Sequence, residues 1–338
     1  MINIISCAVD STLTNGSVKV YRNLVKGLEL IGYPYVVNRR LDATERLWIH
    51  DATTAIPYVD RQRVKTVLGP NMWVMPHDIP PECDFGGAVY VQPSQWKVDL
   101  WNLEGFDRCP LVVWPVGVDT GAFRPAETPA SERRVLIYHK HRDIDELPPI
   151  LDVLHERGLR YRLLLYGSYD ETRFRRCLDE ASFVIWHGTA ETQGLALQEA
   201  FACDVPALVC AGFKLSETQG TYEFGAETDA VAVTPAPYFD ARCGLMADGG
   251  DAIPAAIDEM VARRDEFRPR EYVLENLTLE KQAREFVALW ERWGLTFDEG
   301  LSEPCRSGRP FQFPLRRRAA FAAQGLARFR RKRWNELV

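Results

Sequence analysis

Short apolar runs alternate along the chain with longer stretches whose apolar residues recur every three or four positions. A strand-like run opens the chain at 3–8, and residues 17–32 then repeat apolar residues at helical spacing. Further strands are predicted at 35–37, 46–49, 65–69, 88–92 and 111–115, with a helix over WKVDLWNLEGF before the last of them. This alternation is typical of a parallel sheet covered by helices.

The pattern breaks at residues 117–132, which are rich in Pro, Ala, Thr and Gly and predict a linker. Beyond it, strands are predicted at 133–138, 161–167, 182–186 and 206–209, and helices near 144–158, 171–180 and 195–203. The sequence therefore predicts an α/β fold of two Rossmann-like βαβ domains, residues 1–116 and 133–300. Two such domains facing each other leave a cleft, where ligands bind beside the carboxyl ends of strands.

Composition agrees with two globular domains. The chain has 338 residues, of which 46% are hydrophobic and 26% charged. The N-terminus is typical of a first strand rather than a signal peptide, and no apolar stretch reaches the ~18 residues of a membrane span. Eight cysteines are scattered without a CxxC pair, which indicates reduced thiols and a cytoplasmic location.

The charge is unevenly distributed. Residues 315–338 carry eight basic residues and one acid, a net +7, so the rest of the chain carries −13. An acidic body disfavours nucleic acid as a partner. The basic tail, residues 301–338, is either an amphipathic helix at an anionic membrane surface, on the inner face of the membrane, or a solvated tail.

The stretch ETQGLALQEAFACDVPALV, residues 191–209, places two acids around a glycine at the predicted entry to a helix. Gly194 lets backbone approach a ligand, and free N–H groups at a helix N-terminus attract oxygen-rich groups. Glu199 lies ~6 Å further along the helix axis than the loop that holds Glu191. Carboxylates at that separation suit the paired hydroxyls of a sugar and a ribose. The alternative is a helix-dipole acid and a surface residue.

This stretch resembles the signature of family 4 glycosyltransferases, which have the GT-B fold: Glu, seven residues, Glu, then a small-residue helix and a proline-led strand. WPVGVDTGAFRP (114–125) is similar to that family's entry into the second domain, and VQPSQWKVDLW (91–101) to the preceding strand and helix. The resemblance covers about residues 1–295. It implies an acceptor-side first domain and a second domain that binds a nucleotide sugar.

By this resemblance Glu199 holds the ribose hydroxyls, Glu191 holds the transferred sugar, and the N–H groups near Gly194 and Leu195 support the sugar or phosphate. The family's basic pair corresponds to Lys140 and Arg142, expected to clamp the diphosphate and stabilise its charge. In the family the two residues of that pair stand about five positions apart, whereas Lys140 and Arg142 are two positions apart.

The remaining site residues are predicted from their places at strand ends and helix starts. For the donor they are Thr14, Asn15 and Gly16, in the loop expected to meet the phosphate, and Gly167, Ser168 and Tyr169, where the base would lie. For the acceptor they are His50, Asp51, Asn71 and His77. His139 and His141 lack the partners of a metal site, and Asp143 and Asp145 begin a helix, which indicates capping.

The sequence thus predicts a retaining glycosyltransferase that needs no metal or other cofactor and uses a nucleoside diphosphate sugar. Its acceptor would be a glycan or lipid-linked hydroxyl in surface polysaccharide assembly. A non-catalytic nucleotide-sugar-binding subunit, or an epimerase or hydrolase on the same fold, remains an alternative. A dehydrogenase is disfavoured because no GxGxxG follows the first strand.

Overall fold

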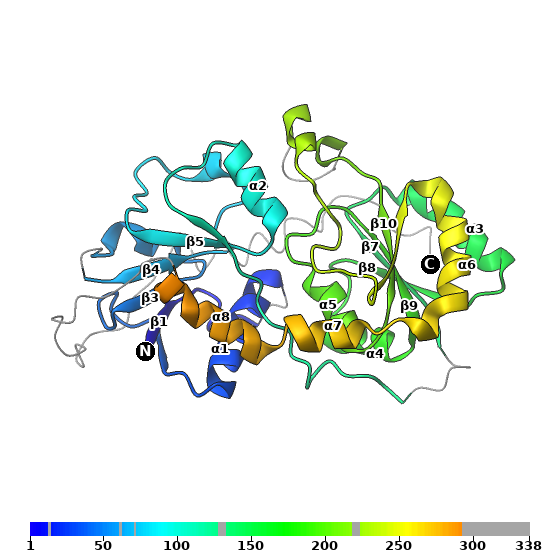
Figure 1. Ribbon diagram of the computed structural model, residues 1–338, viewed down its shortest axis with the longest axis horizontal. Coiled ribbons are helices and arrows are strands. Elements are labelled where there is room, and N and C mark those ends of the chain that lie inside the picture. The colour runs from blue at the N-terminus through cyan, green and yellow to red at the C-terminus, as the bar shows by residue number, and fades with distance from the viewer. Residues whose placement is uncertain (13–14, 61–62, 71, 128–132, 218–223, 293–338) are drawn as a thin grey trace.

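The computed structural model describes residues 1–12, 15–60, 63–70, 72–127, 133–217 and 224–292, and these form two α/β domains (Figure 1). The predicted Thr14 and Asn71, part of the linker and the basic tail lie outside the described residues. Each domain has its own parallel sheet. The structure therefore has the predicted α/β class.

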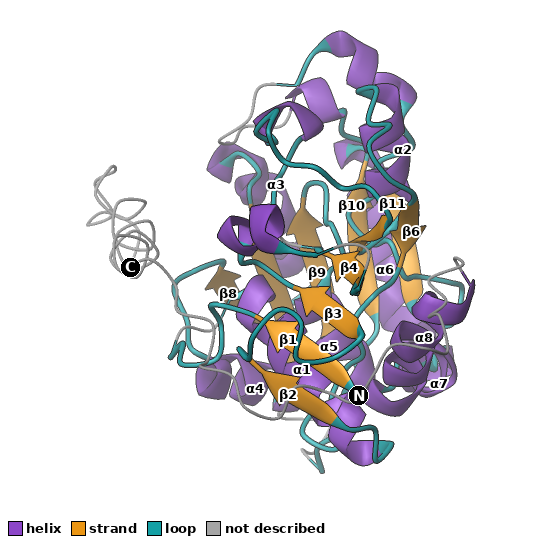
Figure 2. Cartoon of the chain, turned by 90° about the vertical axis from the view of Figure 1, so that its left-hand side faces the viewer, coloured by secondary structure: helices purple, strands orange, loops and turns teal. Residues whose placement is uncertain are grey.

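The first sheet has the strand order β2-β1-β3-β4-β5-β6, and all its pairs are parallel. Its strands are β1 (Ile2–Ile5), β2 (Tyr35–Val37), β3 (Arg46–Ile49), β4 (Lys65–Leu68), β5 (Ala88–Gln92) and β6 (Leu111–Val113). Figure 2 shows β1 to β4 side by side at the front. The inner strands are apolar on both faces because helices cover both sides of a parallel sheet.

Helices α1 (Gly16–Leu30) and α2 (Gln95–Leu103) belong to this domain. Val18, Leu24 and Leu28 of α1 pack on one face of the sheet, and Trp101 of α2 packs on the other. Asn15 begins α1 as its cap, with its side-chain oxygen accepting the Val18 N–H at 2.9 Å.

The second sheet has the order β11-β10-β9-β7-β8 and is also parallel. Its strands are β7 (Arg134–Lys140), β8 (Tyr161–Leu165), β9 (Ala181–Gly188), β10 (Ala207–Ala211) and β11 (Gly244–Asp248). Its helices are α3 (Leu147–Glu156), α4 (Glu171–Asp179), α5 (Leu195–Ala202), α6 (Ile253–Arg263) and α7 (Pro269–Asn276). Helices α3 and α6 cover one face, and α4, α5 and α7 cover the other.

One local prediction of the sequence is confirmed, and a backbone feature lies at the end of α5. Asp143 caps the short helix Ile144–Glu146, its side chain accepting the Asp145 N–H at 3.0 Å. Asp204, which follows α5, has φ +60°, the left-handed conformation that aspartate tolerates better than most residues.

The last helix among the described residues, α8 (Leu279–Arg292), returns to the first domain. Figure 1 shows it (orange) beside α1, and Ala283, Phe286 and Trp290 join the core formed by α1 and the first sheet. The Trp290 indole N–H donates to the Lys65 carbonyl in β4 at 3.0 Å. The predicted second domain, residues 133–300, included this helix, and the structure corrects that boundary: α8 is part of the first core.

An apolar cluster that includes residues of α2 also joins the two domains. Met75, Trp96 and Leu100 of the first domain are buried against Leu215 of the second, with Val231 and Val233 packed alongside. Ala190, next to Glu191, also packs against this cluster.

Candidate functional site

The loop between β9 and α5 is fixed from both domains. Gly194 caps α5 with φ +78°, a left-handed conformation that glycine adopts without strain. The Glu191 N–H donates to the Thr234 carbonyl at 3.2 Å, and its carbonyl accepts the indole N–H of Trp96 from α2 at 2.8 Å. Gln193 is buried and bonds both backbone groups of Val116, the last residue before the linker. The loop is therefore held in one conformation between the domains.

Glu191 pairs with Lys140 at the carboxyl end of β7. The Lys140 Nζ lies 2.7 Å from Glu191 Oε1 and 2.9 Å from Oε2, and 4.5 Å from the Tyr166 ring centre. Burial opposes the ammonium charge, but the Glu191 carboxylate and Tyr166 outweigh it, so the pKa of Lys140 lies above its ordinary value. Lys140 is therefore charged at neutral pH, at the end of a strand that points to the other domain.

Glu199 pairs with a lysine of the other domain. Its Oε1 accepts a hydrogen bond from the Nζ of Lys19 in α1, while its Oε2 is buried and has no partner among the described residues. Burial raises the pKa of Glu199 to about 7, although Lys19 acts in the opposite direction. This carboxylate is desolvated and only half satisfied.

Tyr169 is a partly buried phenol in the second domain, and both acids affect its pKa. Tyr169 donates or accepts a 2.6 Å hydrogen bond with Tyr138, and its ring packs on Tyr138 and Phe174. Burial raises the pKa of Tyr169, and the Glu199 and Glu191 carboxylates raise it further. One side of Tyr169 is covered by the core, and its stacking on the nucleotide base stays a prediction.

Arg142 has a different environment from Lys140. Its guanidinium donates to three backbone carbonyls, of Gly188 at 2.9 Å, Cys210 at 2.9 Å and Ala211 at 3.1 Å, and to Glu146 at 2.8 Å. Four of its five N–H groups are used to join the ends of β7, β9 and β10. The diphosphate contact predicted for Arg142 would require these bonds to break, so we do not carry it into the proposed mechanism.

A histidine pair lies beside Arg142. His139 Nδ1 is 2.9 Å from His187 Nδ1, one ring donating and the other accepting. Burial lowers the pKa of His139, and burial together with Arg142 and His139 lowers the pKa of His187 to about 4. Both rings are therefore neutral at pH 7 and add no positive charge for a phosphate.

The remaining predicted donor residues lie in turns. Asn15 caps α1 and Gly16 begins it, one turn before Lys19, so this helix start faces the same region as Glu199. Gly167 and Ser168 form the turn after β8, where Ser168 Oγ donates to the Leu165 carbonyl at 2.7 Å. Leu195, the first residue of α5, packs against the first-domain core.

The described residues predicted to meet the acceptor have different environments. His50 is fully buried with Nδ1 3.0 Å from Ser6 Oγ, and Asp51 Oδ1 accepts the Cys7 N–H at 2.8 Å. The His77 side chain is 64% exposed, and its Nδ1 lies 3.9 Å from Glu104, at the opposite end of α2 from Trp96. Acceptor contact by His50, Asp51 and His77 stays a prediction.

Sequence reasoning missed Lys19, Trp96 and Gln193. Lys19 stands between the buried Val18 and Val20 and one turn after the predicted phosphate loop, which was the only available signal. Trp96 and Gln193 act through backbone groups distant in sequence, and no spacing reveals such contacts.

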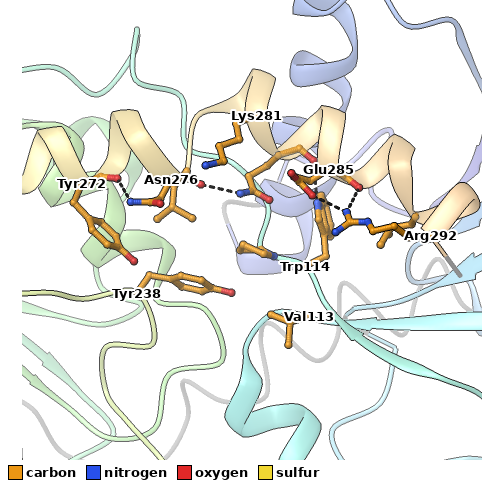
Figure 3. A pocket seen from close by; sticks show the side chains of 12 residues that line it. Val113, Trp114, Tyr238, Tyr272, Asn276, Lys281, Glu285 and Arg292 are labelled. Atoms are coloured by element: carbon orange, nitrogen blue, oxygen red, sulfur yellow. Dashed lines mark hydrogen bonds and ion pairs between the residues drawn. The ribbon is translucent and has the colours of Figure 1, made fainter.

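A cavity of about 340 Å³ lies where α7 gives way to α8. Tyr238 and Tyr272 of the second domain line it together with Lys281, Glu285 and Arg292 of α8 (Figure 3).

No helix in the described part of the chain has the length and apolar character needed to cross a membrane. Within the same residues, no group of three or more His, Cys, Asp or Glu side chains is gathered as a metal site requires. Independence of a metal stays a prediction.

Two parallel sheets, a C-terminal helix that returns to the first domain, and buried acids where the domains meet define a two-domain α/β protein with an interdomain site. No family model and no curated protein sequence matches the chain.

Solved structures match it over most of its length. Sucrose-phosphate synthase from Thermosynechococcus elongatus is 13% identical over 87% of this chain and 99% of that chain, with a TM-score of 0.53. HepE from Anabaena is 11% identical over 86% and 99%, with a TM-score of 0.54. The lipopolysaccharide outer core galactosyltransferase WaaB is 9% identical over 85% and 98%, with a TM-score of 0.53. The likeness shows that the chain has the fold of these GT-B proteins.

Proposed function

We propose that this protein transfers a sugar from a nucleoside diphosphate sugar to a hydroxyl acceptor, with retention of configuration and as a relative of family 4 glycosyltransferases. The observation that carries this proposal is the pair of buried acids, Glu191 and Glu199, each neutralised by a lysine where the domains meet. Hydroxyl groups of a sugar and a ribose are natural donors to these carboxylates, and a diphosphate is the natural partner of the lysines.

The structural neighbours support the donor class. HepE has been solved with UDP and glucose and with UDP-glucose, and a protein of the same fold would hold a similar donor between its domains. The fold alone does not carry function, so the proposal depends on the charged groups that this chain places there.

The reaction follows from these groups. The bond between the anomeric carbon and the diphosphate oxygen breaks, and the Lys140 ammonium stabilises the charge that develops on the leaving group. The acceptor oxygen bonds to the anomeric carbon on the same face, and its proton passes to the departing phosphate. Glu191 orients the transferred sugar and is not assigned as a nucleophile. No step needs a metal, and the enzyme would act in the cytoplasm, with the acceptor a glycan or a lipid-linked sugar.

The experiment is incubation of the full-length protein with UDP- and GDP-sugars and a panel of glycan and lipid-linked acceptors. We expect consumption of one donor, unaffected by EDTA, and a product whose anomeric proton coupling in NMR matches that of the donor. Glu191→Ala protein serves as the control for contaminating activity. An inverted product would contradict retention, and release of free sugar without transfer would identify a hydrolase instead.

A further inference from the structure

Lys19 and Glu199 form an ion pair between the two domains at the centre of the site. Lys19 lies in α1, whose neighbouring Val18 and Val20 are buried in the first core, while its side chain extends to α5 of the second domain. The side chains are 17% and 3% exposed, so the pair is largely shielded from water. Lys19 Nζ also lies 4.0 Å from Glu171 and 5.5 Å from the centre of the Phe123 ring.

Glu199 can accept more hydrogen bonds than Lys19 donates to it. A carboxylate accepts about four hydrogen bonds, and an oxygen left buried without a partner costs free energy. Here Oε2 is buried with no partner in the described structure. Vicinal hydroxyls of a ribose would satisfy both oxygens, and the ammonium of Lys19 would then no longer be needed as their partner.

The charges of the site balance a diphosphate. In the structure Lys140 neutralises Glu191 and Lys19 neutralises Glu199. When hydroxyl groups take over the carboxylates, the two ammonium groups become the counter-charges for the two phosphates of the donor. Lysine suits this exchange because its charge sits on a flexible four-carbon chain.

We propose that Lys19 is a donor-binding residue supplied by the first domain, which pairs with Glu199 in this structure and moves onto the diphosphate when the donor's ribose binds Glu199. This inference rests on the proposed function and deepens it. Both domains would then bind the diphosphate, because Lys19 belongs to the first domain and Lys140 to the second.

The chain offers a matched control on the same helix. Lys26 lies seven residues further along α1, on the same side, and pairs with Asp119 of the linker region. Its side chain is 50% exposed and has no contact with Glu199. Lys26→Met therefore removes an ion pair between α1 and the rest of the chain without changing the site.

The test is calorimetric titration of wild-type, Lys19→Met and Lys26→Met proteins with uridine, UMP and UDP, and with guanosine, GMP and GDP. We expect Lys19→Met to weaken binding of the preferred diphosphate about 10-fold or more, as loss of a charge-assisted contact does, and to change nucleoside affinity less than about 2-fold. Lys26→Met should resemble wild type throughout.

Each other outcome is decisive. Equal weakening of nucleoside and diphosphate would show that Lys19 only positions Glu199, and tighter binding of every ligand would show that it only blocks the site; both overturn the proposal. Unchanged diphosphate affinity overturns it while leaving the proposed function intact. If wild-type protein binds none of the six compounds, the proposed function fails, and this inference fails with it.

Discussion

Lys140→Met is expected to reduce the rate of sugar transfer by about 10²- to 10³-fold, the usual effect of removing one preorganised charge-stabilising group. Methionine keeps the length of the side chain and removes the charge that lies 2.7 Å from Glu191. Since the charge acts on the leaving diphosphate, the loss should appear in kcat as well as in kcat/KM. Steady-state rates with a saturating donor measure it.

The variant needs a control for folding, because it leaves the carboxylate of Glu191 buried without its cation. The double variant Lys140→Met, Glu191→Gln removes this uncompensated charge, and its thermal midpoint should lie close to the wild-type value. Its transfer rate should remain low. Recovery of transfer in the double variant would show that Lys140 only neutralises Glu191 and takes no part in the reaction.

Glu199→Gln is expected to make the folded protein more stable at alkaline pH than the wild type. Burial raises the pKa of Glu199 from its ordinary 4.5 to about 7, so the folded state holds a proton that the unfolded state releases. Between these two pKa values the wild-type free energy of unfolding falls as pH rises. The glutamine variant lacks this titrating group, so its free energy of unfolding does not fall for this reason. The stability difference should grow by about 2 kcal/mol between about pH 5.5 and about pH 8.

Denaturant unfolding of both proteins across this pH range measures the difference. Glu171→Gln is the matched control for the loss of an acid beside Lys19, since Glu171 also faces Lys19 but is 47% exposed. A pH-independent difference for Glu199→Gln would mean that water reaches this carboxylate in the folded protein, which contradicts the buried, half-satisfied acid described above.

Much of the fold could be predicted because alternation of strands and helices is a local property of the sequence. The apolar runs that predicted strands 35–37, 46–49 and 88–92 all form strands with those bounds. The place of α8 could not be predicted in this way. Its amphipathic pattern indicates that one face is buried, but not that Phe286 and Trp290 pack on the first sheet rather than the second.

The candidate site also contains residues that the sequence predicted and residues that it could not predict. Gly194, Glu191 and Glu199 were predicted from one continuous stretch, because a loop and a helix start bring near neighbours together. Arg142 and Lys19 depend on tertiary contacts instead. The carbonyls that Arg142 binds come from β9 and β10, and Lys19 meets its partner 180 residues further along the chain. The spacing of residues along the sequence predicts neither of these two contacts.

The most direct test of the central claim is calorimetric titration of the ligand-free, metal-free protein with UDP and GDP, beside Glu199→Ala. The account predicts saturable binding of one nucleoside diphosphate to the wild type, and binding at least about 10-fold weaker to the variant. Failure of the folded wild-type protein to bind either nucleotide, or equal affinity in the Glu199→Ala variant, would contradict the donor site proposed between the domains.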